Sequence, residues 1–280
     1  MGWPGQLSLD YRADDHNGIA RTIAFDRHEG PLRILASLYP EGPGVCHNVL
    51  VHPPGGIVGG DSLAIDITLA AHTHALLTTP GATRFYRSAG EAATQTLNAK
   101  LADGARLEWL PLETIAHSGC IGENKLRFDL GEGSEMIGWD VLALGLPASN
   151  DAFARGCYTQ TISLPGQWLE RARIDANDTR LLDSPLGWAG RRVLCTMWFA
   201  AGAPIAPARR DSLLDSAREL SAAHELHATA GATAAHASVV VLRVLSARVE
   251  PAMNLLAQVW VRWRQQAWAL PACAPRVWRT

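Results

Sequence analysis

Two histidines are the residues of this sequence whose types and spacing most directly suggest chemistry. His72 and His74 lie two residues apart, so on a strand both would point to the same face, a spacing compatible with a pair of metal ligands. The alternative is that both are ordinary exposed or edge histidines. Hydrolase motifs offer no competing site, because the sequence has neither a G-x-S-x-G elbow nor an H-E-x-x-H helix. A catalytic triad assembled only by folding stays open.

A glycine-rich loop beside an aspartate is the second candidate for chemistry. Residues 52–61 read HPPGGIVGGD, in which the prolines hold the chain extended and the glycine pairs permit a tight loop. A P-loop would require a Gly-Lys-Ser/Thr end, and no lysine lies near Gly60. The dinucleotide fingerprint would require a helix after the glycines, whereas the residues that follow alternate with the period of a strand. Nucleotide binding at this loop is therefore not expected.

The strands beside this loop would hold it in place. Residues 63–69 alternate strictly between large apolar side chains and small or polar ones, which predicts a half-buried strand. Residues 75–79 form a second apolar run. This run ends at Pro80-Gly81, a dipeptide that favours a turn. The sequence here therefore predicts a turn, a strand, a second strand and a second turn.

The rest of the first two-thirds shows strands but no convincing helical periodicity. Residues 94–101 alternate, and Asp103-Gly104 then turns the chain into residues 106–110, a pattern that we interpret as a hairpin. From residue 18 to about 200 no window has the helical period, so the crossover helices of a doubly wound α/β fold are missing. The sequence therefore predicts an antiparallel or solenoid-like β architecture.

Helices are expected only near the C-terminus. Residues 206–222 carry leucines at helical spacing, and Asp211-Ser212 could cap the start of this helix. Residues 251–270 place apolar side chains every three or four positions along one face. A nearly continuous apolar run over residues 238–245 predicts a buried strand between the two helices.

Composition and charge limit the classes of partner. Apolar residues make up 48% and charged residues 19% of the 280 residues, so we expect a partner protein to cover part of the surface. The net charge of -2 provides no basic field for nucleic acid. No uninterrupted apolar stretch reaches the ~18 residues of a membrane span. The N-terminus lacks a basic segment followed by an apolar one, and the five cysteines are scattered, so a cytoplasmic location is expected.

Several motifs in order along the chain resemble the signature of the UreD (UreH) family of urease accessory proteins. HPPGGIVGGD is followed by TTPGATRFYRS, then by WLPLETI at residues 109–115, GWDVLALG at 138–145 and PRVW at 275–278. The matched motifs extend over nearly the whole chain. The signature loop taken from this resemblance comprises His52, Pro53, Pro54, Gly55, Gly56, Gly59, Gly60, Asp61, Thr78, Thr79, Pro80, Gly81, Phe85, Tyr86, Arg87 and Ser88.

The resemblance implies one UreD-like domain over residues 1–280, β-rich over residues 1–205 and helix-containing over residues 206–280. The implied fold is mainly β, a solenoid-like stack of antiparallel or mixed strands with two α-helices in the C-terminal third. UreD-like proteins bind apo-urease and join UreF, which recruits the GTPase UreG, and the assembly delivers nickel to the urease active site. The implied role is a non-catalytic scaffold and nickel conduit. No cofactor would be tightly bound, and nickel would only be in transit.

Candidate contacts for nickel come from the matched motifs and from the histidine pair. Hydrated Ni²⁺ accepts oxygen and imidazole ligands, and a transfer route needs replaceable ligands rather than a closed cage. The alternative is structural, with Asp61 capping its glycine turn and Asp140 holding a strand end. The transit candidates are Asp61, Glu113, Asp140, His72 and His74.

Tryptophans and an arginine near the C-terminus are candidates for the contact with UreF, because these residue types dominate interface anchors. Three of the tryptophans share one predicted helix, and a place in the core is the alternative for them. The interface candidates are Trp260, Trp263, Trp268, Arg276 and Trp278.

The chain departs from the family pattern in one segment. Relatives usually read L-G-R-P-A-S-G-E in this segment. This chain has Leu146 in place of the arginine, and Asn150 and Asp151 in place of the Gly-Glu pair. The loss of the arginine could remove a salt bridge or a contact with UreF. The rival interpretation of the whole chain is a stand-alone β-rich ligand-binding module or an unrecognised hydrolase. A binding module would stay monodisperse alone, whereas an accessory protein would depend on UreF for solubility.

Overall fold

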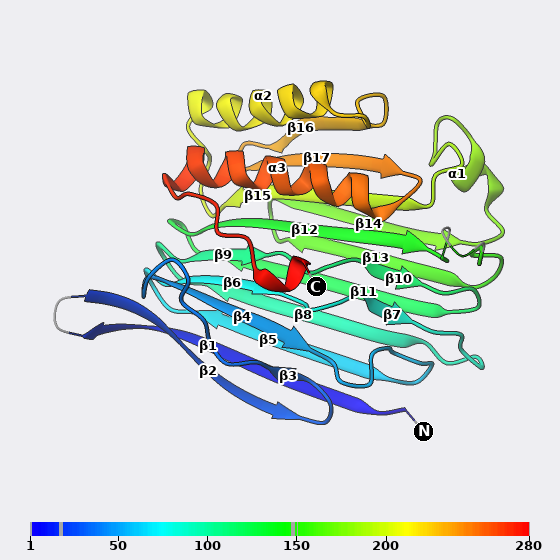
Figure 1. Cartoon of the computed structure of the whole chain (residues 1–280), viewed down its shortest axis with the longest axis horizontal. Coiled ribbons are helices and arrows are strands. Elements are labelled where there is room, and N and C mark those ends of the chain that lie inside the picture. The colour runs from blue at the N-terminus through cyan, green and yellow to red at the C-terminus, as the bar shows by residue number, and fades with distance from the viewer. Residues whose placement is uncertain (1, 17–18, 147–148, 150, 280) are drawn as a thin grey trace.

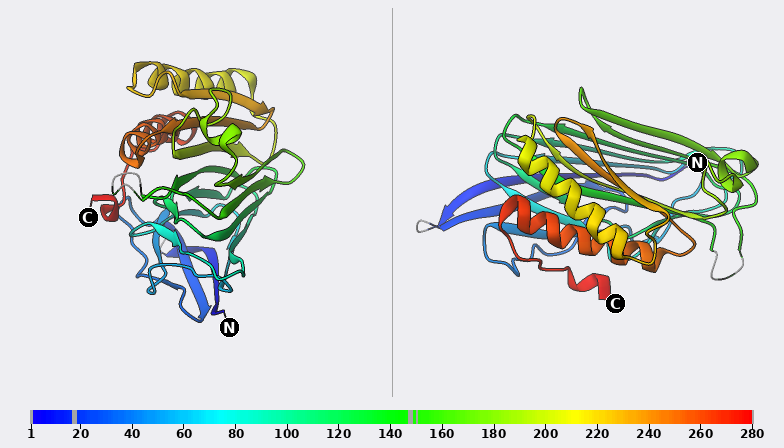
Figure 2. Two further views of the ribbon diagram at one scale, coloured as in Figure 1. Left: turned by 90° about the vertical axis from the view of Figure 1, so that its right-hand side faces the viewer. Right: turned by 90° about the horizontal axis from the view of Figure 1, so that it is seen from above.

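Two β-sheets are stacked face to face, and helices cover the outer face of one of them (Figure 1). The structure is a computed structural model that describes residues 2–16, 19–146, 149 and 151–279. Seen from above, α2 and α3 lie side by side over the strands (Figure 2). The mainly β, solenoid-like architecture expected from the sequence is confirmed.

Among the described residues, the first sheet has seven strands in the order β14-β13-β11-β8-β5-β1-β2. The two edge strands, β2 and β14, pair antiparallel with their neighbours, and all strands between them are parallel. The strands of this sheet are β1 (Pro4–His16), β2 (Ile19–Glu29), β5 (Ser62–Leu69), β8 (Ala93–Leu101), β11 (Ile121–Leu130), β13 (Cys157–Leu164) and β14 (Trp168–Asp175).

The second sheet has ten strands within the same described ranges, with the main order β16-β17-β15-β12-β9-β6-β4-β3 and with β10 joining β12 to β7. Its central strands β4, β6, β9 and β12 are parallel. The strands are β3 (Arg33–Ile34), β4 (Val45–Val51), β6 (His74–Thr78), β7 (Thr83–Phe85), β9 (Arg106–Trp109), β10 (Thr114–Ala116), β12 (Glu135–Leu144), β15 (Val193–Ala201), β16 (Ala230–His236) and β17 (Val239–Ser246).

Along the middle of the chain, the longer strands alternate between the two sheets, and the three-residue strands β7 and β10 interrupt this order. β4, β6, β9 and β12 belong to the ten-stranded sheet, and β5, β8, β11 and β13 belong to the seven-stranded sheet. The crossover that parallel pairing requires is therefore a strand of the opposite sheet rather than a helix. The hairpin expected from residues 94–101 and 106–110 is wrong, because β8 and β9 lie in different sheets and the turn at Asp103-Gly104 connects those sheets.

The two long helices lie close to their expected positions. The helix over 206–222 is α2, which begins at Pro207 rather than at a polar cap, since Ala206 provides no side-chain hydrogen bond. The expected cap at Asp211-Ser212 is wrong, because both residues lie inside the helix. In the described part of the chain, no helix is long and apolar enough to cross a membrane. The helices are α1 (Thr179–Asp183), which the sequence did not predict, α2 (Pro207–Ala223), α3 (Val249–Trp268) and the 3-10 helix η2 (Arg276–Arg279).

Two hydrophobic cores result from this layering, one between the sheets and one between the ten-stranded sheet and the helices. Strand β12 separates them. Met136 and Leu142 face the seven-stranded sheet, whereas Ile137 and Trp139 face the helices. A strand buried on both faces reads as a nearly continuous apolar run. Asp140 is the one acidic residue among the buried positions of β12, and its place in the alternation turns it toward the seven-stranded sheet.

Candidate functional site between the sheets

The inner face of the seven-stranded sheet carries three amide side chains at one level. The parallel register places Asn124 of β11 beside Gln95 of β8 and beside Gln160 of β13. Gln95 Nε2 donates to Asn124 Oδ1 at 3.2 Å, and Asn124 Nδ2 donates to Gln160 Oε1 at 3.4 Å. Asn124 and Gln160 are buried. The three amides therefore form a hydrogen-bonded line within an interior that is otherwise mostly apolar.

The facing sheet continues this line. Asp140 of β12 lies beside Thr196 of β15, which lies beside Arg243 of β17. Asn124 Nδ2 donates across the interior to Asp140 Oδ1 at 3.4 Å. Thr196 Oγ1 and Arg243 Nε both donate to the carboxylate of Glu170, each at 3.1 Å. We call these residues the polar row: Gln95, Asn124, Gln160, Asp140, Thr196, Glu170 and Arg243.

Two buried polar atoms at the polar row have no partner within hydrogen-bond geometry among the described residues, although the Gln160 amide lies close enough to the Asp140 carboxyl group to lower its pKa. They are Gln160 Nε2 and the hydroxyl oxygen of Tyr158. Tyr158 is fully buried, and Gln160 is 6% exposed. Because a buried polar atom without a partner costs free energy, such atoms in a native fold call for a physical explanation. Both atoms can donate a hydrogen bond to a polar ligand that binds at the row.

Asp140 changes its protonation state near neutral pH. Burial raises the pKa of Asp140 from 3.8 to about 7, the nearby Glu170 carboxylate adds to this rise, and Gln160 acts in the opposite direction. The carboxyl group is therefore largely neutral below this pH and negatively charged above it. The negative charge that the row carries therefore depends on pH.

The polar row ends at a cavity on one side and at the surface on the other. Gln95 lines a cavity of about 170 Å³ together with signature-loop residues that include His52, Gly55 and Thr79. At the other end, the side chain of Arg243 is 53% exposed. The row therefore extends from the signature loop to the edge where β14 and β17 face each other.

Close packing and one carboxylate hold the signature loop in shape. A Cβ atom at Gly56 would lie only 2.1 Å from Tyr86 Cε2, so the loop has room for glycine alone at this position. Asp61 Oδ1 accepts a hydrogen bond from Trp3 N at 2.8 Å, and Asp61 Oδ2 accepts one from Val58 N at 3.0 Å. Both oxygens of Asp61 thus hold the backbone of the glycine turn.

A second set of polar side chains is buried between the ten-stranded sheet and α3. Glu108 of β9 is fully buried and accepts hydrogen bonds from His74 Nε2 at 2.7 Å, Trp260 Nε1 at 2.6 Å and Arg264 Nε at 3.1 Å. Arg264 also pairs with Glu41 at 2.7 Å. Burial alone would raise the pKa of Glu108, but His74, Arg264 and Trp260 together lower it below its usual value. This buried charge cluster fixes α3 to the sheet.

Comparison with known proteins places this geometry in a family. The family described as UreD urease accessory protein matches residues 4–279. Urease accessory protein UreD of Leptothrix cholodnii is 61% identical over 280 residues, and that of Variovorax paradoxus is 59% identical over 280 residues, in each case over the whole of both chains. The protein of the same name from Methylibium petroleiphilum is 56% identical, again over the whole of both chains. The chain belongs to the UreD family. Its function is that of a urease accessory protein.

The metal-ligand candidates of this UreD-family chain do not come together. Among the described residues, no group of three or more His, Cys, Asp or Glu side chains could hold a metal ion. His72 lies in a turn at φ 60°, whereas His74 begins β6, so the expected shared strand face is wrong. His74 pairs with Glu108, and Glu113 lines an outer groove. Of the candidates, Asp140 alone belongs to the polar row.

The tryptophans of α3 are core residues. Trp260, Trp263 and Trp268 are buried, and each donates its indole N–H to the sheet or to α2. Arg276 is exposed and Trp278 is half-buried. Of the five candidates for the partner interface, only Arg276 and Trp278 could contact another protein without repacking of the core.

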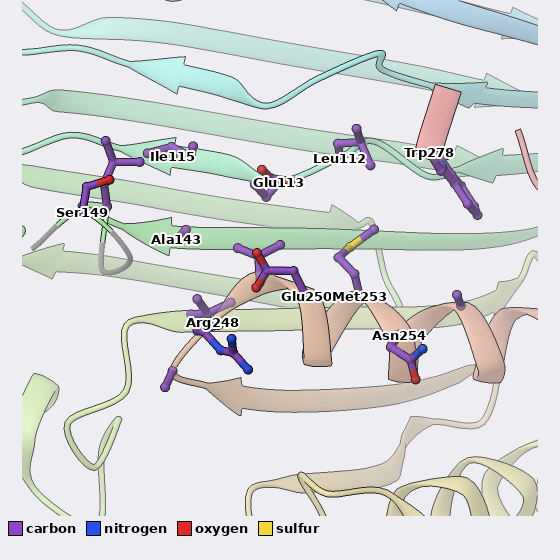
Figure 3. A pocket seen from close by; sticks show the side chains of 16 residues that line it. Leu112, Glu113, Ile115, Ala143, Ser149, Arg248, Glu250, Met253, Asn254 and Trp278 are labelled. Atoms are coloured by element: carbon purple, nitrogen blue, oxygen red, sulfur yellow. The ribbon is translucent and has the colours of Figure 1, made fainter. Parts of the chain in front are cut away.

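An outer groove of about 670 Å³ separates the start of α3 from the ten-stranded sheet (Figure 3). Glu113 lies on the sheet side of this groove, and Arg248 and Glu250 lie on the α3 side. Leu146, one of the residues at which the sequence was expected to depart from the family pattern, also lines the groove with an apolar side chain. Asn150, a second departure, lies outside the described residues.

Sequence reasoning missed most of the polar row. The available signal was a polar residue in phase with apolar ones, such as Asn124 in phase with Leu126, or Gln160 in phase with Ile162. A single polar residue at an inward position of a strand is common and does not by itself indicate a functional site. Only the register between strands shows that the inward polar positions meet at one level.

Proposed function

We propose that this chain serves urease maturation as a non-catalytic scaffold and nickel conduit, and that nickel passes along the polar row. The proposed partners are UreF, the GTPase UreG and apo-urease, and the proposed location is the cytoplasm. The observation that carries the proposal is the polar row itself, a line of hydrogen-bonded side chains that leads from the signature-loop cavity through an apolar interior.

The chemistry of the row suits an ion in transit. Asn124 and Gln160 offer amide oxygens, and Asp140 offers one carboxylate, all of which are replaceable ligands for hydrated Ni²⁺. A closed set of imidazole or thiolate ligands would bind the ion too tightly for release. The Tyr158 hydroxyl and Gln160 Nε2 could donate to the water molecules that the ion carries.

Activation of apo-urease tests this proposal. The chain is combined with UreF, UreG, apo-urease, nickel, bicarbonate and GTP, and the appearance of urease activity is followed over time. Asn124→Leu places an apolar side chain of similar size in the middle of the row. We expect this variant to slow activation severalfold while it still assembles with the partners. Asn98→Leu is the matched control, because Asn98 lies exposed on the outer face of neighbouring strand β8.

Three outcomes separate the parts of the proposal. A wild-type chain that adds nothing to activation would refute the maturation role in this form. Full activation by Asn124→Leu would refute the polar row as the route and leave the scaffold role standing. A soluble, monodisperse chain that binds neither UreF nor UreG would favour a stand-alone binding module.

A further inference from the structure

Two exposed arginines share a hollow at one end of the β-sandwich. Arg87 and Arg155 line it together with Ser88, Gly119 and Ile121. Both arginines are exposed, and within the described residues neither guanidinium has a hydrogen-bond or ion-pair partner. Neither the conduit nor the buried charge cluster uses these side chains.

The backbone ties the loops that carry these arginines together. Ser88 N donates to Gly119 O at 2.9 Å, and Gly119 N donates to Arg155 O at 2.7 Å. Gly119 has a φ of +83°, and a Cβ atom there would lie 2.8 Å from Arg87 Cγ and 3.5 Å from Arg155 Nε. Both side chains therefore lie across the same glycine. The missing side chain at Gly119 is what allows them to approach each other.

No acidic side chain among the described residues compensates the positive charge of Arg87 and Arg155. Glu91 and Asp151 lie on the adjoining loops, but neither is within ion-pair distance of Arg87 or Arg155. Several other surface arginines of this protein do have such partners, as Arg127 has in Asp129 at 2.7 Å. Two guanidinium groups that line one hollow attract an anionic group that enters it.

We propose that this arginine hollow receives a carboxylate from an acidic segment of a protein partner. A guanidinium presents parallel N–H donors that match the two oxygens of a carboxylate. The hollow is open to solvent, so water and dissolved salt weaken the binding of a free small anion to these arginines. A carboxylate that arrives on a docked protein is held at high local concentration, which overcomes this competition. The proposal rests on the proposed function only for the partners to be tested, namely apo-urease, UreF and UreG.

Charge reversal tests the hollow directly. Purified full-length chain carrying Arg87→Glu and Arg155→Glu together is compared with wild type for its affinity to each of the three partners, at low and at high NaCl concentration. We expect the double variant to lose about tenfold or more in affinity for one partner at low salt, and we expect its affinity to depend less on salt. Replacing both arginines by lysine keeps the charges but not the forked donors, so an intermediate loss is expected.

Controls separate this inference from the proposed function. Arg171→Glu is the matched control, because Arg171 is an exposed arginine on β14 without a partner among the described residues. Thermal unfolding of every variant should match wild type, since among the described residues no hydrogen bond or ion pair of these side chains is removed. If the double variant bound all three partners with wild-type affinity and activated urease normally, the arginine hollow would not be a docking site, and the proposed function would stand. If inorganic phosphate bound to wild type but not to the double variant, and the partner affinities were unchanged, the proposal would also be refuted. The hollow would then be a site for a free anion.

Discussion

Replacing Asp140 by asparagine should stabilise the protein above neutral pH. Burial raises the pKa of Asp140 from 3.8 to about 7, so the folded state keeps this proton up to near neutral pH, whereas the unfolded chain releases it near pH ~4. The free energy of unfolding of the wild type therefore falls as the pH rises from about 4 to about 7, and it stays at the lower level beyond. A shift of about three pKa units corresponds to about 4 kcal/mol.

Urea unfolding at about pH 5 and about pH 8 measures this effect. Asp140→Asn has no charge to bury, so we expect it to exceed wild type by about 4 kcal/mol at the higher pH and by only about 1 to 2 kcal/mol at the lower pH. Asp66→Asn is the matched control, because Asp66 lies exposed on the outer face of β5. A stability difference for Asp140→Asn that is the same at both pH values would refute the assignment of this carboxyl to a poorly solvated interior.

The same variant tests the proposed passage of nickel along the polar row. Asparagine keeps one oxygen ligand but loses the carboxylate charge that attracts a cation. We therefore expect Asp140→Asn to slow urease activation, most clearly above neutral pH, although the folded protein is more stable there. Partial unfolding could not explain a variant that is at once more stable and less active. Unchanged activation at about pH 8 would remove Asp140 from the route.

Three further substitutions probe other parts of the structure. Arg264→Met should cost about 3 to 5 kcal/mol in urea unfolding because it leaves the buried Glu108 charge without its cationic partner, and a loss below about 1 kcal/mol would contradict the buried pair. Gly138→Ala would place a Cβ atom 2.4 Å from Trp198 Cζ2, so we expect a loss of about 1 to 3 kcal/mol, and an unchanged melting temperature would contradict this close contact. Asp61→Ala should cost about 1 kcal/mol and speed amide hydrogen exchange in the signature loop, and unaltered exchange there would argue against its capping role.

Local patterns in the sequence located most elements near the signature loop and the helices. The alternation over residues 63–69 corresponds to β5, and the apolar run over residues 75–79 corresponds to β6. The stripe over residues 251–270 corresponds to α3. These predictions succeed because the period of side-chain burial is set within one element. Helix α1 was missed because its five residues are too few to display a helical period.

Pairing between strands could not be predicted in the same way. The turn at Asp103-Gly104 has the residues of a hairpin turn, yet it joins strands of opposite sheets. Gly104 is at φ +67°, a conformation that glycine supplies for either connection. The direction of the chain after such a turn depends on which surface buries the next strand, and that is a property of the whole stack.

The sequence by itself determined the family, the strand-rich body and the order of elements, because motifs and periodicities are local features. Only the tertiary structure decided which polar residues meet. Gln95, Asn124 and Asp140 are separated by tens of residues along the chain, and they come together because parallel winding and inter-sheet stacking bring their strands to one level. In the same way, the helix tryptophans lie in the core because the buried charge cluster fixes α3 against the sheet with Trp260 and Arg264 inward.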